Sequence, residues 1–285
     1  MNPRLIIGIV VGLVMVALGG FVFLLKPYSG DALVASSAPP AQSGGSSSVA
    51  VTPVAVVPQR PPAPPPPMAT AASIEAEIAS SENADLLALL KKNFNPEYND
   101  LLAAAARRRN EGASDQAFSQ ELEDRFQAIM RGKLKYGVGA GMAAIDRLAA
   151  NEASLFHALG TEGAPLCLKM LGRDDAPAAA PPPESVRQLM RRGTLYRFQA
   201  IAEGMSNTKP VGDLTADERR AFEASLSREG LNFKDVSTGA YLNKGSTEPG
   251  KPCLTLETLH LAISRLAEGT RRKIYAGMFF LGRDN

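Results

Sequence analysis

The first 67 residues differ from the rest of the chain in their pattern of hydrophobic and polar positions. Residues 5–25 form a run of 21 residues without a charge or a proline. A helix of that length measures about 30 Å, the thickness of the hydrocarbon core of a bilayer. The apolar region of a cleaved signal peptide is shorter, about 7–15 residues, and a small-residue cleavage site follows it. We therefore expect residues 5–25 to be an uncleaved transmembrane anchor, preceded by a short cytoplasmic N-terminus at residues 1–4.

Residues 26–67 are rich in Ser, Gly, Ala and Pro, and this composition does not support a packed core. The Ser/Gly stretch at 43–48 is typical of a flexible coil, whereas the prolines of 61–67 favour an extended polyproline rod. We expect a disordered linker here. A second break, Ala-Pro-Ala-Ala-Ala-Pro-Pro-Pro at 176–183, is either a loop or part of a sub-boundary at 173–183.

Residues 68–285 show the hydrophobic spacing of amphipathic helices. In one segment, Phe118, Leu122, Phe126 and Ile129 recur at intervals of four, four and three residues, which places them on one helix face. Eight segments are predicted as helices on such grounds: 81–92, 95–111, 114–132, 142–159, 184–204, 215–229, 255–268 and 270–281.

Helix-end signals accompany these segments. Thr215 and Glu218 have the spacing of a capping box, and Gly230 is a suitable residue to end that helix. Asn95 precedes Pro96, which predicts an N-cap followed by proline at the first helical position. No stretch alternates strictly between polar and apolar residues over a strand's length. The predicted fold class is all-α, a bundle or orthogonal arrangement of eight or nine helices over residues 68–285, in one domain or in two subdomains divided at 173–183.

Composition and charge reduce the number of function classes that fit the sequence. The chain has a net charge of +2, and residues 68–285 contain 28 basic and 28 acidic residues, which argues against a nucleic-acid binder. The acids are in excess by three in residues 68–172, and the bases by three in residues 173–285. Opposite charges favour docking of the two halves, although salt weakens this attraction.

The charges around the anchor give a weak indication of orientation. Arg4 precedes the apolar run, and Lys26 follows it with Asp31 nearby, so the bias towards a cytoplasmic N-terminus is small. A proline-rich spacer suits a protein that reaches across a compartment. We expect a single-pass protein of the bacterial inner membrane with most of the chain in the periplasm; a eukaryotic type II membrane protein would share this layout.

Gly8 and Gly12 form a Gly-x-x-x-Gly pair within the anchor. Such a pair allows two membrane helices to approach closely, which makes a homodimer one interpretation. The alternative is that these glycines have no such role, because glycine is frequent in membrane helices.

Cys167 and Cys253 are the two cysteines of the chain. In an oxidising compartment an even number of cysteines favours pairing, and both cysteines follow a similar Thr-Glu and proline context at Thr161 and Thr247. We predict a disulfide that joins the segments on either side of the second proline-rich break. The alternative is two separate buried thiols.

A chemical role for these cysteines would need a histidine. His157 and His260 each lie near one cysteine in the sequence, so a Cys–His nucleophile or a Cys₂His₂ metal site is conceivable. Neither spacing matches a local motif of that kind. Both histidines sit in apolar helical runs, where we expect hydrogen-bonded residues at the edge of the core. We predict no metal and no cofactor.

Two further motifs have mainly structural interpretations. Gly137-Val-Gly-Ala-Gly141 fails the dinucleotide-binding pattern, because Met142 follows directly and no strand precedes it. It is expected to be a flexible lead-in to a helix or a place where helices pack closely. The basic triplet 271–273 opens the last predicted helix, where it is either solvated or faces a carboxylate or an anionic surface.

The leading functional interpretation is a non-enzymatic envelope protein whose helical domain binds an unidentified envelope protein or serves as a scaffold. The alternative is an all-α periplasmic hydrolase that acts on a cell-envelope polymer, with Glu152, Glu162 or Glu248 as its candidate acid. A purely structural spacer is a third interpretation. A deep cleft holding a desolvated carboxylate would favour the enzyme, and a broad exposed apolar patch would favour the binding module.

Overall fold

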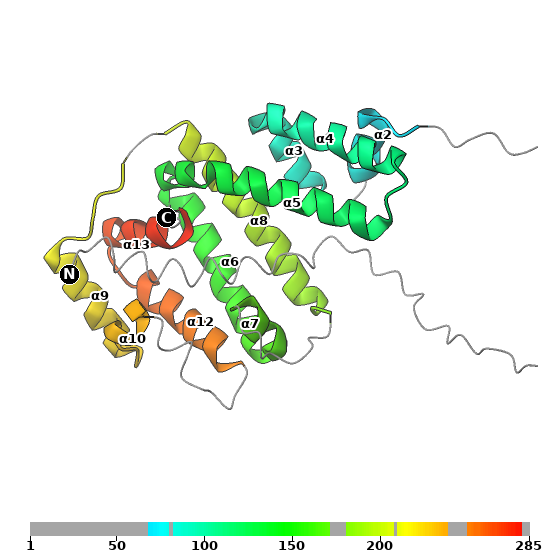
Figure 1. Cartoon of the computed structure of the whole chain (residues 1–285). Coiled ribbons are helices and arrows are strands. Elements are labelled where there is room, and N and C mark those ends of the chain that lie inside the picture. The colour runs from blue at the N-terminus through cyan, green and yellow to red at the C-terminus, as the bar shows by residue number, and fades with distance from the viewer. Residues whose placement is uncertain (1–67, 80–81, 172–180, 208–209, 239–249, 281–285) are drawn as a thin grey trace, which may run out of the picture. The chain divides into compact units, whose positions relative to one another are not determined.

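The computed structural model describes residues 68–79, 82–171, 181–207, 210–238 and 250–280, and every regular element in these ranges is a helix (Figure 1). The α-helices are α2 (Ala71–Ala79), α3 (Ala84–Asn93), α4 (Asn95–Asn110), α5 (Asp115–Lys133), α6 (Met142–Thr161), α7 (Ala164–Met170), α8 (Glu184–Met205), α9 (Ala216–Arg228), α10 (Phe233–Thr238), α12 (Lys251–Ser264) and α13 (Glu268–Phe280). One 3₁₀ helix, η2 (Leu134–Gly139), joins α5 to α6. The predicted all-α class is confirmed for this part of the chain.

The predicted number of helices, eight or nine, is too low, because the described residues contain eleven α-helices. All eight predicted segments are present. The three additional helices, α2, α7 and α10, have nine, seven and six residues. Helices this short complete too few turns to display a repeating hydrophobic stripe. The segment predicted at 255–268 begins four residues earlier, at Lys251, and ends at Ser264.

The signals predicted at both ends of α9 are confirmed. The hydroxyl of Thr215 accepts from the backbone N–H of Glu218 at 3.2 Å, and the Glu218 carboxylate accepts from the N–H of Thr215 at 2.7 Å. Gly230 has a φ of 73°, a left-handed conformation that suits the residue after a helix. The prediction for Asn95 is wrong. Phe94 is the N-cap, and Asn95 is the first residue of α4.

The predicted anchor at 5–25, its Gly8 and Gly12, the linker at 26–67 and most of the 173–183 break lie outside the described residues. Within the described helices, none combines the length and the hydrophobicity needed to cross a membrane. Helices on either side of the break are in contact, because α6 packs against both α8 and α12.

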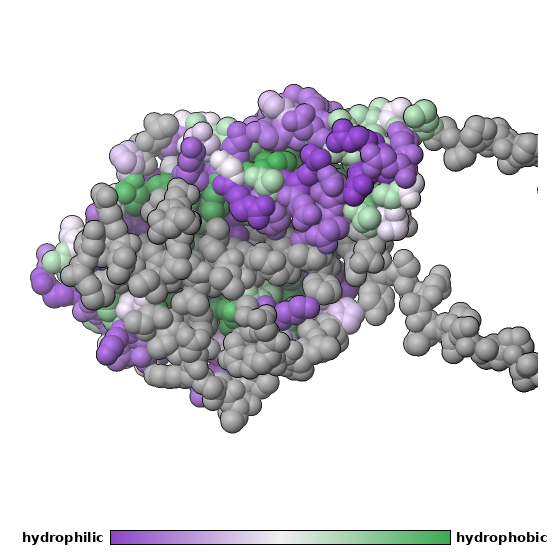
Figure 2. Space-filling view, viewed as in Figure 1, coloured by the Kyte–Doolittle hydropathy of each residue, from purple (hydrophilic) through white to green (hydrophobic). Residues whose placement is uncertain are grey.

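Helices α6 and α8 form the centre of the packing (Figure 1). Helix α6 also packs against α7, α12 and α13, and α9 packs on α12. Helix α8 contacts η2 and α3, while α2, α3 and α5 all pack on α4. Figure 2 shows mostly hydrophilic side chains over α4 and α5, on the face that this view presents.

A buried ion pair lies between the two central helices. Glu152 of α6 accepts a hydrogen bond from Arg197 of α8 at 2.8 Å, and each side chain is only 3 % exposed. Arg271 of α13 makes two hydrogen bonds, of 3.1 and 3.0 Å, with the carboxylate of Asp146 in α6. In both pairs the acid belongs to residues 68–172, where acids are in excess, and the base belongs to residues 173–285, where bases are in excess. This is the arrangement expected if opposite charges help the two parts to dock.

The basic triplet at 271–273 contacts carboxylates within the chain. Lys273 binds the carboxylate of Glu218 at 2.7 and 2.9 Å. The side chains of Arg271 and Lys273 are about four-fifths buried, since 20 % and 24 % of their surfaces are exposed. Two of the three bases therefore face carboxylates of this chain and are not part of a solvated face.

The glycine-rich segment is a close contact between η2 and α8. A Cβ atom on Gly204, in the last turn of α8, would lie 1.9 Å from the carbonyl oxygen of Tyr136. A Cβ atom on Gly139 would lie 1.9 Å from the carbonyl oxygen of Asn207. These distances are far below van der Waals contact, so both positions require glycine. Close packing, one of the two interpretations of this segment, is the one observed.

We predict that Gly204→Ala destabilises the protein strongly, because two backbones must separate to admit one methyl group. The expected loss in free energy of unfolding is about 2–4 kcal/mol, the range of severe overpacking. Urea unfolding of both proteins measures it. Gly132→Ala in α5 is the matched control, because nothing lies within 4 Å of its added Cβ. Alanine favours a helix over glycine by about 0.5–1 kcal/mol, so the control should be neutral or stabilised. Equal effects of the two substitutions would contradict the close contact.

Candidate functional site

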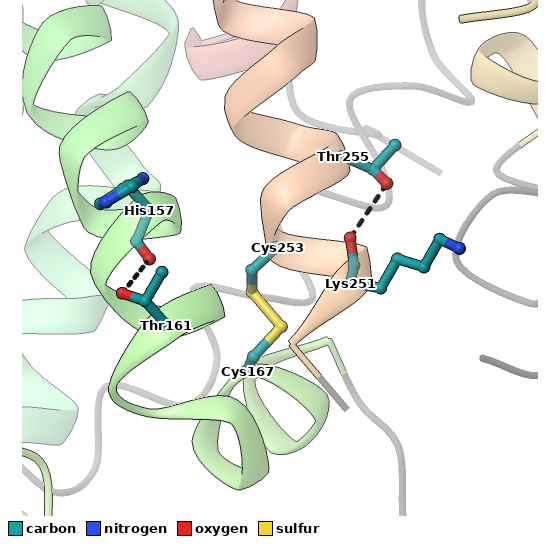
Figure 3. The surroundings of a disulfide bond; sticks show 6 residues. All are labelled: His157, Thr161, Cys167, Lys251, Cys253 and Thr255. Carbon is teal, nitrogen blue, oxygen red and sulfur yellow. Dashed lines mark hydrogen bonds between the residues drawn. A yellow bond between two sulfur atoms is a disulfide. The ribbon is translucent and has the colours of Figure 1, made fainter. Parts of the chain in front are cut away.

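The two cysteines lie at bonding distance. The sulfur atoms of Cys167 in α7 and Cys253 in α12 are 2.12 Å apart, and their Cα atoms are 6.1 Å apart (Figure 3). Both residues are completely buried. The disulfide ties α7 to α12 across 86 residues of sequence. Because both sulfur atoms are joined in the disulfide, neither cysteine is available as a nucleophile or as a metal ligand while the bond is intact.

The histidines near the cysteines do not form a site with them. Figure 3 shows the ring of His157 turned away from the disulfide, and its Nδ1 lies 3.0 Å from a carboxylate oxygen of Glu257. His260 is 2 % exposed and stacks on Tyr275 and Phe279, with ring centroids 5.6 and 6.1 Å apart. No group of three or more His, Cys, Asp or Glu side chains in the described part of the chain is placed to hold a metal ion.

The expectation of a hydrogen-bonded His260 at the edge of the core is wrong. His260 lies within the core, and neither ring nitrogen has a hydrogen-bond partner among the described residues. Burial lowers its pKa to about 4, so the ring is neutral at physiological pH. His260 therefore acts as one more aromatic ring of the core.

Of the three acids suggested for a hydrolase, the two that the structure describes already have partners within the chain. Glu152 is engaged with Arg197 in the buried pair between α6 and α8. Glu162 is exposed and accepts a hydrogen bond from the hydroxyl of Ser185 at 2.8 Å. Glu248 lies outside the described residues.

A cavity of about 330 Å³ lies between α3, α5 and α8. This volume is at the lower end of the range for small-ligand pockets, about 300–1,000 Å³. The cavity exists because α3 is held by α4 and α8, whereas α5 is held by α4 and η2. Apolar side chains from all three helices line it: Leu86, Phe126, Met130 and Leu195.

One acid among the lining residues is deeply buried. Glu123 of α5 is 4 % exposed, and its buried Oε1 has no hydrogen-bond partner among the described residues. Burial disfavours the charged carboxylate and, with a smaller contribution from the negative charge of Asp124, raises the pKa of Glu123 to about 7. Glu123 therefore changes its charge near physiological pH.

The charged groups around the cavity do not neutralise Glu123. Arg191 pairs with the carboxylates of Glu82 and Glu184. Arg192 is exposed and has no ion-pair partner in the described part of the chain. Asp85 adds a further acid to the lining.

A buried carboxyl group with these surroundings can act in two ways. An unpaired, buried carboxylate can bind a positively charged or hydrogen-bond-donating group from outside the domain. A carboxyl group with a pKa near 7 can also give or take a proton at physiological pH.

Sequence reasoning missed Glu123, although a signal for it was present. Glu123, Phe126 and Met130 follow one another at intervals of three and four residues, so an acid shares a helix face with two large apolar residues. That pattern indicates an acid that points towards a partly buried surface. It did not indicate which helices would enclose that surface.

Comparison with protein-family models, with curated proteins and with solved structures finds no match for this chain. The function is therefore argued from the site alone.

We predict that Glu123 makes the protein less stable as the pH rises. The pKa is raised from 4.5 to about 7 in the folded state, so the unfolded chain releases this proton more readily. The stabilising contribution is complete below pH 4.5 and is lost as the pH rises through 7. Each pKa unit corresponds to about 1.4 kcal/mol, so the loss is about 3 kcal/mol.

Urea unfolding between pH 4 and pH 8 measures this effect in the wild type and in Glu123→Gln. The stability of the variant relative to the wild type should increase by about 3 kcal/mol over this range, because glutamine does not titrate. Glu121→Gln, on the same helix but outside the cavity lining, should show no such increase. A constant difference between Glu123→Gln and the wild type would contradict the assignment.

Proposed function

We propose that the chain is a single-pass, membrane-anchored envelope protein whose helical domain binds a partner protein at the cavity between α3, α5 and α8. The observation that carries this proposal is the burial of Glu123 in a partly apolar cavity, where its Oε1 has no hydrogen-bond partner among the described residues. A buried polar group that lacks a hydrogen bond costs about 1–3 kcal/mol, and more when it is charged. A partner that supplies the missing contact recovers that energy on binding.

The remaining surface gives less support to a binding role. Among the described residues after α5, the exposed large apolar side chains are Tyr136, Met205, Leu254 and Leu261. Leu254 and Leu261 are two turns apart on α12, whereas Tyr136 and Met205 belong to η2 and α8. Single exposed apolar residues are normal on protein surfaces. The cavity is therefore the feature on which the proposal depends.

The location in the cell rests on the sequence. Residues 5–25 serve as the anchor, with the N-terminus in the cytoplasm, and the linker at 26–67 gives the domain reach within the periplasm of a bacterial cell. Gly8 and Gly12 offer a contact for dimerisation of the anchor. The paired cysteines agree with an oxidising compartment.

A second candidate, a hydrolase of a cell-envelope polymer, is favoured by one observation. Glu123 combines a cavity with a pKa of about 7, which is the property required of a general acid. Glu82 and Asp85 line the same cavity and are the candidates for a second carboxylate, although Glu82 is paired with Arg191. In this case Glu123, and none of the three acids suggested by the sequence, would donate the proton.

For the location, we predict that alkaline phosphatase fused after residue 67 is active in a bacterial host, because that enzyme requires the periplasm. The control fusion lacks residues 1–26 and should be inactive. Phosphatase activity in whole cells measures both. An inactive full fusion, or release of a shortened soluble form, would contradict the anchored periplasmic arrangement.

For the binding role, we predict that a photo-crosslinking amino acid at Gln127 forms one discrete protein adduct in membranes of cells that express the full chain. Gln127 lines the cavity, whereas Asp100 on the exposed side of α4 is the control position and should give no such adduct. Gel electrophoresis after illumination detects the adduct. Adding Glu123→Gln should weaken it, because the buried carboxylate contributes to the contact.

An activity assay on the full chain distinguishes the binding module from the hydrolase. Incubation with purified cell-envelope polymer should release no soluble fragments if the domain is a binding module. Release of fragments that Glu123→Gln abolishes would replace the binding module with the hydrolase. The absence of both the adduct and the fragments would overturn both proposals for the cavity.

A further inference from the structure

Two glutamates of this domain have almost no exposed surface but differ in their surroundings. Glu152 is 2 % exposed and Glu123 is 4 % exposed. Glu152 has a counterion within the fold, because Arg197 lies 2.8 Å away and is buried with it. Glu123 lines the cavity, and the neighbouring charge that contributes to its raised pKa, that of Asp124, has the same sign. The fold thus provides a cation for one buried carboxylate and provides none, among the described residues, for the other.

The cations on the cavity lining do not fill this role. Arg191 is already shared by Glu82 and Glu184, so its charge is satisfied. Arg192 lies on the exposed part of the lining. Two further acids, Glu82 and Asp85, line the same cavity beside the start of α3, although Glu82 is paired with Arg191.

The walls of the cavity suit an aliphatic chain. Leu86, Phe126, Met130 and Leu195 offer apolar surface from three helices, and the volume of about 330 Å³ admits one long side chain. Lysine covers apolar surface with its four-carbon stem while its ammonium group remains polar. An ammonium group is a compact charge that needs one acceptor oxygen, and Oε1 of Glu123 is a buried oxygen without a partner among the described residues. The planar fork of arginine instead needs both oxygens of a carboxylate to be presented side by side.

We infer that the cavity between α3, α5 and α8 receives a lysine side chain of the partner protein, with the ammonium group on Glu123 and the stem against the apolar walls. This inference rests on the proposed binding function and names the group that the site recognises. The partner thereby supplies to Glu123 the kind of contact that Arg197 supplies to Glu152.

The test uses N-acetyl-lysine-N-methylamide as the probe, together with the full chain in detergent and methyl-labelled methionine. At pH 8 the probe should shift the NMR signal of Met130 in a saturable way. Two neutral analogues, the norleucine and the ε-acetyl-lysine compounds, should bind at least tenfold more weakly, and so should the arginine compound. Glu123→Gln should weaken binding of the lysine compound at least tenfold, and Glu121→Gln should leave it unchanged.

Each other outcome contradicts the inference. If the norleucine compound binds as tightly as the lysine compound, the cavity selects an apolar group, and the proposed partner contact survives without its lysine. Equal binding of the arginine compound would refute the preference for lysine. If no compound shifts the Met130 signal while the Gln127 adduct still forms, the inference fails and the proposed function stands. If the adduct is absent as well, the proposed function fails with it.

Discussion

The contact between η2 and the last turn of α8 is the constraint on which the rest of the described structure depends. Gly139 and Gly204 bring two backbones together without space for a side chain. Because η2 connects α5 to α6, this one contact fixes where α5 ends and where α6 begins relative to α8. Helix α6 then lies along α8, and α5 reaches α4 without filling the space beside α3 and α8. The cavity is the result of this arrangement.

The packing of α5, α6 and α8 gives the two buried glutamates different surroundings, and this difference bears on function. Between α6 and α8 the helices are in direct contact, and the buried carboxylate of Glu152 meets the guanidinium of Arg197. Between α5 and α8 a cavity takes the place of such contact, and Oε1 of Glu123 has no hydrogen-bond partner among the described residues. Breaking a buried pair commonly costs about 3–5 kcal/mol, which indicates how unfavourable an uncompensated buried charge is. A side chain that costs the fold stability without a partner in the fold is a candidate for a role in binding or catalysis.

The features predicted correctly from the sequence are those that residues close together in the chain determine. The long helices have repeating apolar positions, and the capping box at Thr215 needs only residues within one turn. The short helices α2, α7 and α10 could not be predicted this way, because tertiary contacts stabilise them. Asn95 was misassigned because α4 begins one residue earlier than its capping preference predicts: Phe94 is both the C-cap of α3 and the N-cap of α4, without a side-chain capping hydrogen bond. The cysteine pairing was predictable because two cysteines allow one pairing.

The candidate site was less accessible to sequence reasoning. Glu152 and Glu123 look alike in the sequence, since each lies on an amphipathic helix with a large apolar residue three positions later, Leu155 and Phe126 respectively. Their difference arises from a neighbour on another helix, Arg197 in one case and the cavity in the other. The burial of His260 was missed for a similar reason, because its core partners Tyr275 and Phe279 come from α13. Which side chains face one another across helices is set by tertiary packing, and a single sequence does not encode it in a local pattern.

Both proposals for the cavity rest on the claim that Glu123 is a buried carboxyl group without a counterion among the described residues. Direct titration of its carboxyl carbon by ¹³C NMR, with the signal assigned by its loss in Glu123→Gln, tests this claim most directly. The account predicts a midpoint at about pH 7, because burial disfavours the charged form. A midpoint at or below about 4.5 would show that the carboxylate is solvated or paired, and it would contradict the account.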